Sequence, residues 1–333
     1  MTRRSNALLS LLLVLFPLIA AFGLEFAAFL YRPVKPAAST VVNVTPGLSF
    51  AEVARQLEVA GVVRSADGFK LLGWLRRDVR RIKAGPYEFG SSATPGRVLD
   101  RLVAGDVQRQ RLTIPEGFSL REIAGRLEAE GVGRAETFLQ LTHDPDFIAS
   151  LGISSPSLEG YLFPDTYLFD NGTPEDRIIR AMVRQLTNRL APDLVEGAAK
   201  LGLDPHQLVT LASIVQKEAG NRGEMPVIAA VFHNRLRRNM PLQADPTVVY
   251  GVADYKGTIT RKHLQTPTPY NTYRMVGLPP GPIASPGEDA LRASAFPAES
   301  DYLFFVSRGD GTHTFSRTLN EHNRAVQQYR LRR

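Results

Sequence analysis

The sequence predicts an α+β protein with an N-terminal transmembrane helix. Three observations support this: an apolar run near the N-terminus, a strand–turn–helix pattern that occurs twice, and a C-terminal half with helical apolar stripes and a strand pair. A chain of 333 residues has room for more than one core. The predicted divisions are an N-terminal segment 1–6, an apolar helix 7–31, a linker 32–40, an α/β module 41–110, a second strand–helix repeat and connecting region 111–150, and an α+β domain 151–333.

The N-terminal apolar run has the length of a membrane span. Ala7–Leu24 contains no charge, Glu25 interrupts, and Phe26–Tyr31 is apolar again. Eighteen apolar residues lie at the threshold for crossing a bilayer. Arg3 and Arg4 precede the run, so the N-terminus should be cytoplasmic and the bulk of the chain extracytoplasmic, on the periplasmic side. We therefore expect a single-pass anchor in the inner (cytoplasmic) membrane, with a cleaved signal peptide as the alternative.

The net charge of +7 is concentrated at the two ends of the chain. Most of it comes from Arg3, Arg4, Arg32, Lys35, Arg330, Arg332 and Arg333. The body is therefore nearly neutral, which argues against a nucleic-acid partner. The chain has no cysteine, so it has neither disulfides nor thiol chemistry.

An internal repeat follows the predicted linker. Residues 45–62 align with residues 115–132 at a constant offset of 70. Each copy follows a short β run and has a glycine turn, then Ser49 or Ser119 with a glutamate three residues later, the pattern of a helix capping box. A strand–turn–helix unit that ends at glycine resembles part of the LysM fold, whose modules bind N-acetylglucosamine polymers. The first copy is the LysM-like candidate, whereas the second is better explained as a repeat packed for stability.

One acidic residue lies on the apolar stripe of a helix predicted over residues 205–219. Asp204 suits the N-cap, Pro205 the first turn and Gly220 the exit. The stripe consists of Leu208, Leu211, Ala212, Val215 and Ala219. Glu218 lies on or beside it, and burial raises the pKa of a carboxyl toward neutrality, as a general acid at pH 7 requires. The alternative is a structural ion pair, for which the candidates are Arg222, Arg235 and Arg237.

Two polar segments and a rigid Pro/Gly loop follow this helix, at residues 243–251, 265–273 and 277–287. Planar amides, hydroxyls and aromatic faces held on rigid loops are typical of ligand clefts that bind sugars. The candidate substrate-binding residues are Gln243, Asp245, Thr247, Tyr250, Tyr270, Asn271, Thr272 and Tyr273. An ordinary structured loop has the same composition, so composition does not separate the two interpretations.

The rest of the C-terminal domain is predicted from caps and alternation. We expect a helix over Pro226–Leu236, a capping box at Ser285 that starts a helix to about Ala295, a hairpin of Tyr302–Arg308 with Thr312–Ser316, and a last helix from Leu319. His313 and Asn323 could line a cleft or be structural. The histidines His233, His263, His313 and His322 show no metal-ligand spacing, so we expect no metal site.

Five motifs together resemble one family, the endolytic murein transglycosylases or YceG-like proteins. In order they are LEGYLFPDTY, LASIVQKEAG, VFHNRLRRNMPLQADPTVVYG, TPTPYNTYRMVGLPPGPIASPG and GTHTFSRTLNEHN. The resemblance covers about residues 40–330. The family's catalytic acid falls on Glu218. Many relatives carry glutamate where this chain has Gln216, a departure that leaves Glu218 as the only carboxyl in the helix.

The resemblance implies a reaction that needs a single carboxyl and no cofactor. Glu218 would protonate the oxygen between N-acetylmuramic acid and N-acetylglucosamine, and would then accept the proton of the muramoyl C6 hydroxyl as a 1,6-anhydro ring closes. The implied partners are peptidoglycan glycan strands and membrane-bound peptidoglycan synthases, and the expected role is to terminate nascent strands. Two alternatives remain: a hydrolase with Asp245 or Glu224 as second carboxylate, and a non-catalytic wall-binding anchor.

Overall fold

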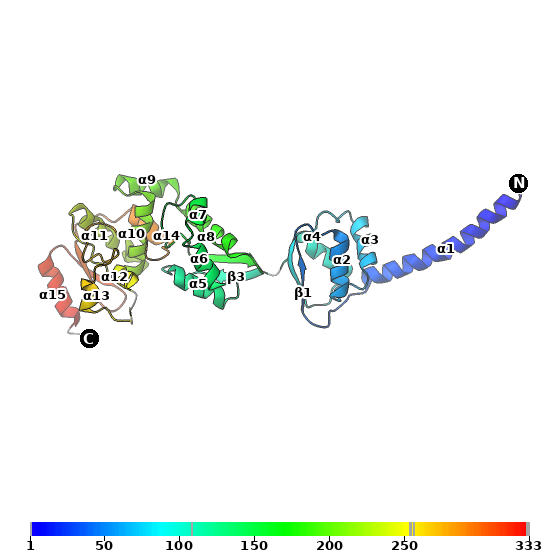
Figure 1. Ribbon diagram of the computed structural model, residues 1–333, viewed down its shortest axis with the longest axis horizontal. Helices are drawn as coiled ribbons and strands as arrows, with labels where there is room; N and C mark the ends of the chain where they lie inside the picture. Colours follow the sequence, from blue (N-terminus) through cyan, green and yellow to red (C-terminus); the bar gives the residue numbers. More distant parts are fainter. Residues whose placement is uncertain (1, 108, 253–254, 256, 331–333) are drawn as a thin grey trace. The chain divides into compact units, whose positions relative to one another are not determined.

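The computed structural model describes the backbone of residues 2–107, 109–252, 255 and 257–330, and all of their side chains except those of 2–14, 18, 19 and 330. The chain divides into two compact units, Met1–Gln110 and Arg111–Arg333 (Figure 1). Both units mix helices with two-stranded antiparallel sheets. The predicted α+β class is confirmed.

The first unit packs helices against one strand pair. Its elements are α1 (Thr2–Tyr31), β1 (Thr40–Val44), α2 (Phe50–Val59), α3 (Ala66–Leu75), β2 (Gly85–Phe89) and α4 (Pro95–Ala104). β1 pairs antiparallel with β2, and Val42 lies opposite Tyr87. The fully buried side chains Leu57, Phe69 and Tyr87 belong to one core cluster. The LysM-like assignment of this unit remains a prediction.

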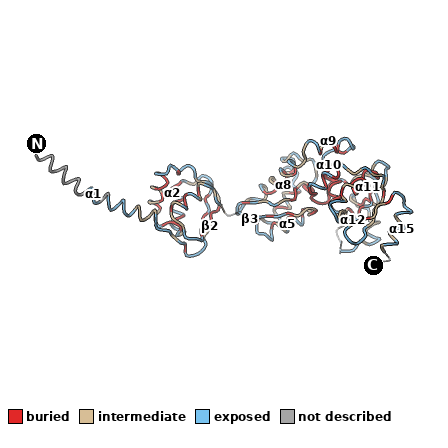
Figure 2. Tube along the Cα trace, turned by 180° about the vertical axis from the view of Figure 1, so that it is seen from behind, coloured by how far each residue is buried: buried red, intermediate tan, exposed pale blue. Residues whose placement is uncertain are grey.

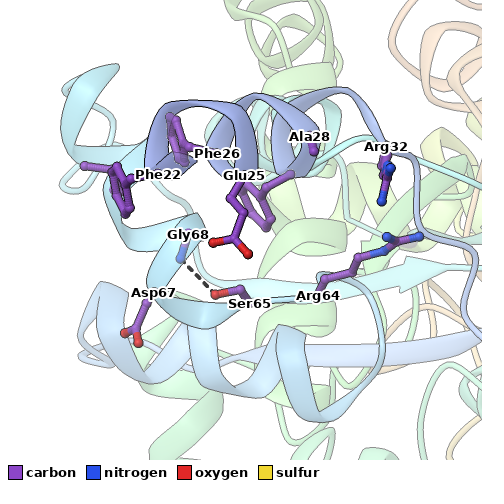
Figure 3. Close-up of a pocket in the computed structure, with 11 residues that line it drawn as sticks. Phe22, Glu25, Phe26, Ala28, Arg32, Arg64, Ser65, Asp67 and Gly68 are labelled. Atoms are coloured by element: carbon purple, nitrogen blue, oxygen red, sulfur yellow. Dashed lines mark hydrogen bonds between the residues drawn. The ribbon is translucent and has the colours of Figure 1, made fainter. Parts of the chain in front are cut away.

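The C-terminal turns of α1 belong to the first unit. Phe26 and Phe29 pack against its core, and a Cβ atom on Gly68 would lie 3.2 Å from the Phe29 ring, so this glycine lets α3 approach α1 closely. Between the two helices, Glu25 points toward the Ser65–Gly68 turn at the start of α3, in a cavity of about 480 Å³ (Figure 3).

No helix among the described residues has both the length and the apolar character needed to cross a bilayer. The side chains of 7–14, 18 and 19 in the predicted anchor, and those of the predicted cytoplasmic segment 1–6, lie outside the described side chains. The anchor therefore stays a prediction.

The segment 32–40, predicted as a linker, is held against the first unit. The backbone N–H of Val34 donates to the carbonyl of Ala93 over 2.9 Å, and the N–H of Ala93 returns a bond of 3.0 Å. Pro36, two residues after Val34, is buried. These contacts fix the direction in which the chain leaves α1.

Both capping boxes predicted in the internal repeat are confirmed. The N–H of Ser49 donates to Glu52 Oε2 over 2.8 Å, and the N–H of Ser119 donates to Glu122 Oε2 over 2.7 Å. In each copy the serine hydroxyl accepts from the backbone N–H of that glutamate in return. The repeat thus starts equivalent helices in the two units, because each box satisfies two N–H groups that a helix N-terminus leaves unpaired.

The first part of the second unit contains β3 (Arg109–Thr113), α5 (Leu120–Ala129), α6 (Ala135–Leu141), α7 (Pro145–Ser150), β4 (Thr166–Asp170) and α8 (Glu175–Arg189). β3 pairs with β4. Leu112, Phe138 and Ile148 share one core cluster with Leu162 and Ile178. Residues 111–150 therefore pack with the first part of the region 151–333, and the domain boundary at 150/151 stays a prediction.

The second part of this unit surrounds one central helix. Its elements are α9 (Pro192–Lys200), α10 (Pro205–Glu218), the 3₁₀ turn η1 (Arg222–Glu224), α11 (Met225–Arg237), α12 (Asp245–Gly251), α13 (Arg261–Gln265), α14 (Glu288–Ala295), β5 (Phe304–Ser307), β6 (His313–Ser316) and α15 (Leu319–Arg330). α10 packs against α9, α11, α12 and α14 (Figure 1). Both α10 and α11 are buried along most of their length (Figure 2). The helix after Glu218, the hairpin and the last helix are confirmed.

The capping box predicted at Ser285 is wrong, although the helix that it was to start ends at Ala295 as expected. α14 begins at Glu288, its N-cap is Gly287, and the Ser285 hydroxyl has no hydrogen-bond partner among the described atoms. The backbone of Ser285 instead exchanges hydrogen bonds of 2.8 Å with Gly117 and Phe118. These tertiary contacts hold Ser285 away from the helix start, which the local sequence does not reveal.

Candidate active site

Glu218 is the last residue of α10, and the start of that helix is built as predicted. The Asp204 carboxylate accepts the N–H of Gln207 over 2.8 Å, and the Gln207 side chain accepts the N–H of Asp204 over 3.0 Å. Pro205 occupies the first turn, and residues 208–215 are all buried. A helix fixed at its start and along its length delivers Glu218, partly buried, to the wall of a cavity.

This cavity has a volume of about 480 Å³ and is the candidate active site. Besides Glu218, its wall includes Arg235 from α11, Gln243 and Asp245 at the start of α12, and Tyr273 from the loop after α13. The hairpin and the last helix close it with His313, His322 and Asn323, among others. The expectation that His313 and Asn323 could line a cleft is confirmed.

The surroundings of Glu218 favour its protonated form. Burial raises the pKa of this carboxyl to about 8, and the negative charge of Asp245 acts in the same direction. The positive charge of Arg235 and a hydrogen bond from the backbone N–H of Asp245 oppose the shift. Glu218 therefore carries a proton at neutral pH, as a general acid must.

The alternative of a structural ion pair for Glu218 does not hold among the described residues. No Lys, Arg or His nitrogen lies within 4 Å of its carboxylate in the described part of the chain. Arg222 instead lies 3.3 Å from Glu116 and 3.5 Å from Asp289, and Arg237 donates to the Asn234 side chain. Two of the three arginines considered are therefore occupied elsewhere.

Arg235 is buried and ties α11 to the loop before α12. Its Nε donates to the carbonyl of Leu303 over 2.7 Å, and one terminal nitrogen donates to the carbonyl of Leu242 over 2.8 Å and to Gln243 Oε1 over 3.3 Å. Burial lowers the pKa of the guanidinium, whereas Tyr273 and Glu218 act in the opposite direction. The sequence indicated Arg235 only as an ion-pair candidate for Glu218 and did not reveal this role.

Three of the eight predicted binding residues line the cavity and five do not. Gln243, Asp245 and Tyr273 line it with Glu218. Thr247 and Thr272 are fully buried and bonded to each other over 2.8 Å, and the Thr272 hydroxyl also accepts the N–H of Ala244. The hydrogen bonds of Thr247 and Thr272 hold the start of α12 in place.

Asn271, Tyr250 and Tyr270 also lie away from the lining of this cavity. The Asn271 amide donates to the carbonyl of Thr266 over 2.7 Å and to that of Leu264 over 3.1 Å, which closes the loop after α13. Tyr250 and Tyr270 pack edge to face with ring centroids 4.7 Å apart. The sugar-binding role of these residues stays a prediction.

A second buried carboxyl, which the sequence did not single out, lies next to Tyr250. Glu159 is 5% exposed, and its Oε1 accepts the N–H of Leu120 over 3.1 Å. Burial raises its pKa to about 7, while hydrogen bonds from the Leu120 N–H and the Tyr250 hydroxyl oppose that shift. Because Asp245 and Tyr250 lie at opposite ends of α12, Glu159 holds the far end of the helix that carries Asp245.

Known proteins of one family are similar to this chain over most of its length. The YceG-like family matches residues 42–328 of the chain. A protein of Bacillus subtilis (strain 168) named endolytic murein transglycosylase is 33% identical over 325 residues, which cover 91% of this chain and 90% of that protein. The protein of that name in Streptococcus pneumoniae serotype 2 (strain D39) is 30% identical over 320 residues, 86% of this chain and 58% of that protein. A crystal structure of a yceG-like protein from Listeria monocytogenes has a TM-score of 0.60 and 34% identity, and it covers 86% of this chain and 98% of its own.

Proposed function

We propose that this chain, which belongs to the YceG-like family, is a lytic transglycosylase that cleaves the glycan strands of peptidoglycan. The observation that carries the proposal is a protonated carboxyl, Glu218, in the wall of a cavity lined by polar and aromatic side chains. The names of the relatives from Bacillus subtilis and Streptococcus pneumoniae support the same reaction.

The reaction starts with proton transfer from Glu218. Its O–H donates to the glycosidic oxygen between N-acetylmuramic acid and N-acetylglucosamine, and the bond from C1 to that oxygen breaks. The C6 hydroxyl of the muramoyl residue attacks C1, gives up its proton to a base in the cavity and closes a 1,6-anhydro ring, so no water is consumed. Because the nucleophile belongs to the same sugar, its high effective molarity favours ring closure over hydrolysis.

Asp245 acts on this step through its charge. It lies in the same cavity wall, and its negative charge raises the pKa of Glu218. A fixed negative charge would also stabilise the positive charge that develops on the sugar ring as the bond breaks. The hydroxyl of Tyr273, which donates to Asp245 over 2.6 Å, keeps this carboxylate in place.

We further propose that the apolar run Ala7–Leu24 anchors the enzyme in the cytoplasmic membrane with the second unit outside. Arg3 and Arg4 before an uncharged run support this orientation. An anchored active site reaches only glycan close to the membrane, where membrane-bound synthases extend new strands. Internal cleavage there would terminate nascent strands, and the LysM-like first unit would hold the strand.

Mass spectrometry of digested peptidoglycan tests the reaction. We expect the full chain in detergent to release fragments with 1,6-anhydro-muramoyl ends and a broad range of lengths, because cleavage is internal. Reducing ends, which are heavier by one water, would show a hydrolase instead. No products at all would leave a wall-binding protein.

The anchor has its own test in cells. A form that lacks residues 1–21 but keeps Phe26, Phe29 and the segment 32–40, exported to the same side of the membrane, should leave glycan strands longer than the full chain does. Normal strand lengths with this form would refute the tether while leaving the reaction untouched.

A further inference from the structure

The hairpin places a histidine in the cavity with a carboxylate behind it. His313 opens β6, and Glu224 ends η1, shortly after α10. The Nδ1 atom of His313 lies 2.8 Å from Glu224 Oε2, and the backbone N–H of His313 donates to Glu224 Oε1 over 3.1 Å. One carboxylate thus binds both the ring and the backbone of this residue, which fixes the orientation of the imidazole.

The hairpin turn is also locked against the exit of α10. A Cβ atom on Gly220 would lie 2.7 Å from the carbonyl oxygen of Gly311, a distance that real Cβ atoms do not reach. Gly220 is two residues after Glu218, and Gly311 is two residues before His313. The two cavity residues Glu218 and His313 therefore come from backbone segments that are in direct contact.

The contact with Glu224 decides which ring nitrogen of His313 carries the hydrogen and which one remains an acceptor. A carboxylate accepts hydrogen bonds only, so Nδ1 carries the hydrogen and, in the neutral ring, Nε2 keeps a lone pair. Nε2 has no hydrogen-bond partner among the described residues, and the edge of the ring packs against Phe305 with centroids 5.4 Å apart. His313 thus has an oriented acceptor atom in the wall that Glu218 shares.

We propose that His313 is the general base that takes the proton of the muramoyl C6 hydroxyl, positioned by Glu224, while Glu218 acts only as the general acid. This inference rests on the proposed transglycosylase function. The O6–H bond breaks with its proton moving to Nε2, the O6–C1 bond forms, and the bond from C1 to the leaving oxygen breaks as that oxygen takes the proton of Glu218. The imidazolium then returns a proton to the Glu218 carboxylate through solvent, which restores both groups.

With two separate groups, deprotonation of the C6 hydroxyl need not wait until the glycosidic bond has broken. If Glu218 did both tasks, no base would exist until it had given up its proton, so deprotonation of the C6 hydroxyl could only follow bond cleavage. A neutral imidazole beside a protonated carboxyl is ready at the start, so attack and departure can overlap.

The other titratable groups in the cavity wall are poorer bases. These are Arg235, Asp245, Tyr273 and His322. Asp245 is already bonded to the Tyr273 hydroxyl. The His322 ring stacks on Phe304 with centroids 5.3 Å apart, and burial and then the charge of Arg235 lower its pKa. Of the two histidines in the cavity wall, only His313 is bonded to a carboxylate among the described residues.

The test is the pH dependence of anhydro-end formation by the full chain in detergent. For the wild type we expect an alkaline limb from Glu218. His313→Gln should lower kcat by about 100-fold or more with KM little changed and the alkaline limb in place, as expected when a general base is lost. Glu224→Gln should lower kcat by a smaller factor, because glutamine keeps an oxygen that accepts the Nδ1 hydrogen but loses the charge.

His143→Gln is the matched control, since His143 is exposed in the turn between α6 and α7 and its recorded bonds are local, to Leu139 and Thr142. It should keep the wild-type rate and profile. A folded His313→Gln variant with the wild-type kcat would overturn the inference. If that variant does not fold, a wild-type kcat in Glu224→Gln overturns it. If the wild type forms no anhydro ends, the proposed function itself fails.

Discussion

Tyr273 donates its hydroxyl to Oδ1 of Asp245 over 2.6 Å in the wall of the cavity that holds Glu218. The bond holds the Asp245 side chain in place, and burial followed by the contact with Asp245 raises the pKa of the tyrosine. The charge of Asp245 in turn raises the pKa of Glu218. The two residues together tune the general acid.

Asp245→Asn should move the alkaline limb of the pH–rate profile to lower pH. Glu218 must be protonated to act, so activity is lost as the pH rises through its pKa of about 8. Removing the neighbouring negative charge lowers that pKa. Initial rates of anhydro-end formation between pH 5 and pH 9 measure the limb.

Asp176→Asn controls for the loss of a carboxylate, because Asp176 is exposed on α8 and lies 3.9 Å from Arg180. It should leave the alkaline limb where the wild type has it. An unchanged limb in Asp245→Asn would show that Asp245 does not tune Glu218.

Gly220→Ala should lower activity strongly. The new methyl group would lie 2.7 Å from the Gly311 carbonyl, a backbone atom, so the hairpin that carries His313 must move away from α10. We expect a rate loss of about 10-fold to 100-fold, because small misplacements of catalytic groups cost about that much. Gly223→Ala is the matched control, since its methyl group would meet only the Asn221 side chain at 3.4 Å. Equal rates in the two variants would contradict the close packing of hairpin and helix.

Asn271→Ala should destabilise the fold by about 2 kcal/mol, because buried carbonyls lose their donor. The carbonyls of Thr266 and Leu264 accept from its amide, and its oxygen accepts the N–H of Tyr273. Urea unfolding followed by circular dichroism measures the change. A variant with wild-type stability but a raised KM would instead show that Asn271 binds the glycan directly.

Glu159→Gln should stabilise the protein at alkaline pH and change it little at pH 4. Burial raises the pKa of Glu159 from 4.5 to about 7, so the folded state binds more protons than the unfolded state between these values, and the wild type loses stability as the pH rises through them. The full effect is about 3 kcal/mol at pH 8. Equal pH dependence of the free energy of unfolding in both proteins would refute this account.

The local sequence predicts elements whose signals are local. Asp204 and Pro205 define the start of α10, Ser49 and Ser119 start equivalent helices, and the glycine turn of the hairpin separates β5 from β6. Each of these features depends on residues within a few positions of one another, so spacing alone carries them.

The cavity depends instead on contacts between distant parts of the chain. His313 and Glu224 are 89 residues apart, and Tyr273 and Asp245 are 28 apart, so no spacing rule pairs them. Asn271 was found by its sequence pattern, but the pattern does not reveal what the residue does. Its amide is needed to close a loop, and a sequence pattern cannot distinguish that use from sugar binding, because both need the same donors and acceptors.

Glu218→Gln tests the central claim most directly. Glutamine keeps the size and hydrogen-bonding capacity of the side chain but has no proton to donate as an acid. With the full chain in detergent, we expect anhydro-muramoyl ends to fall by at least about 100-fold at pH 7, with the thermal unfolding midpoint unchanged or raised. Anhydro ends formed by a folded Glu218→Gln variant at the wild-type rate would contradict the account.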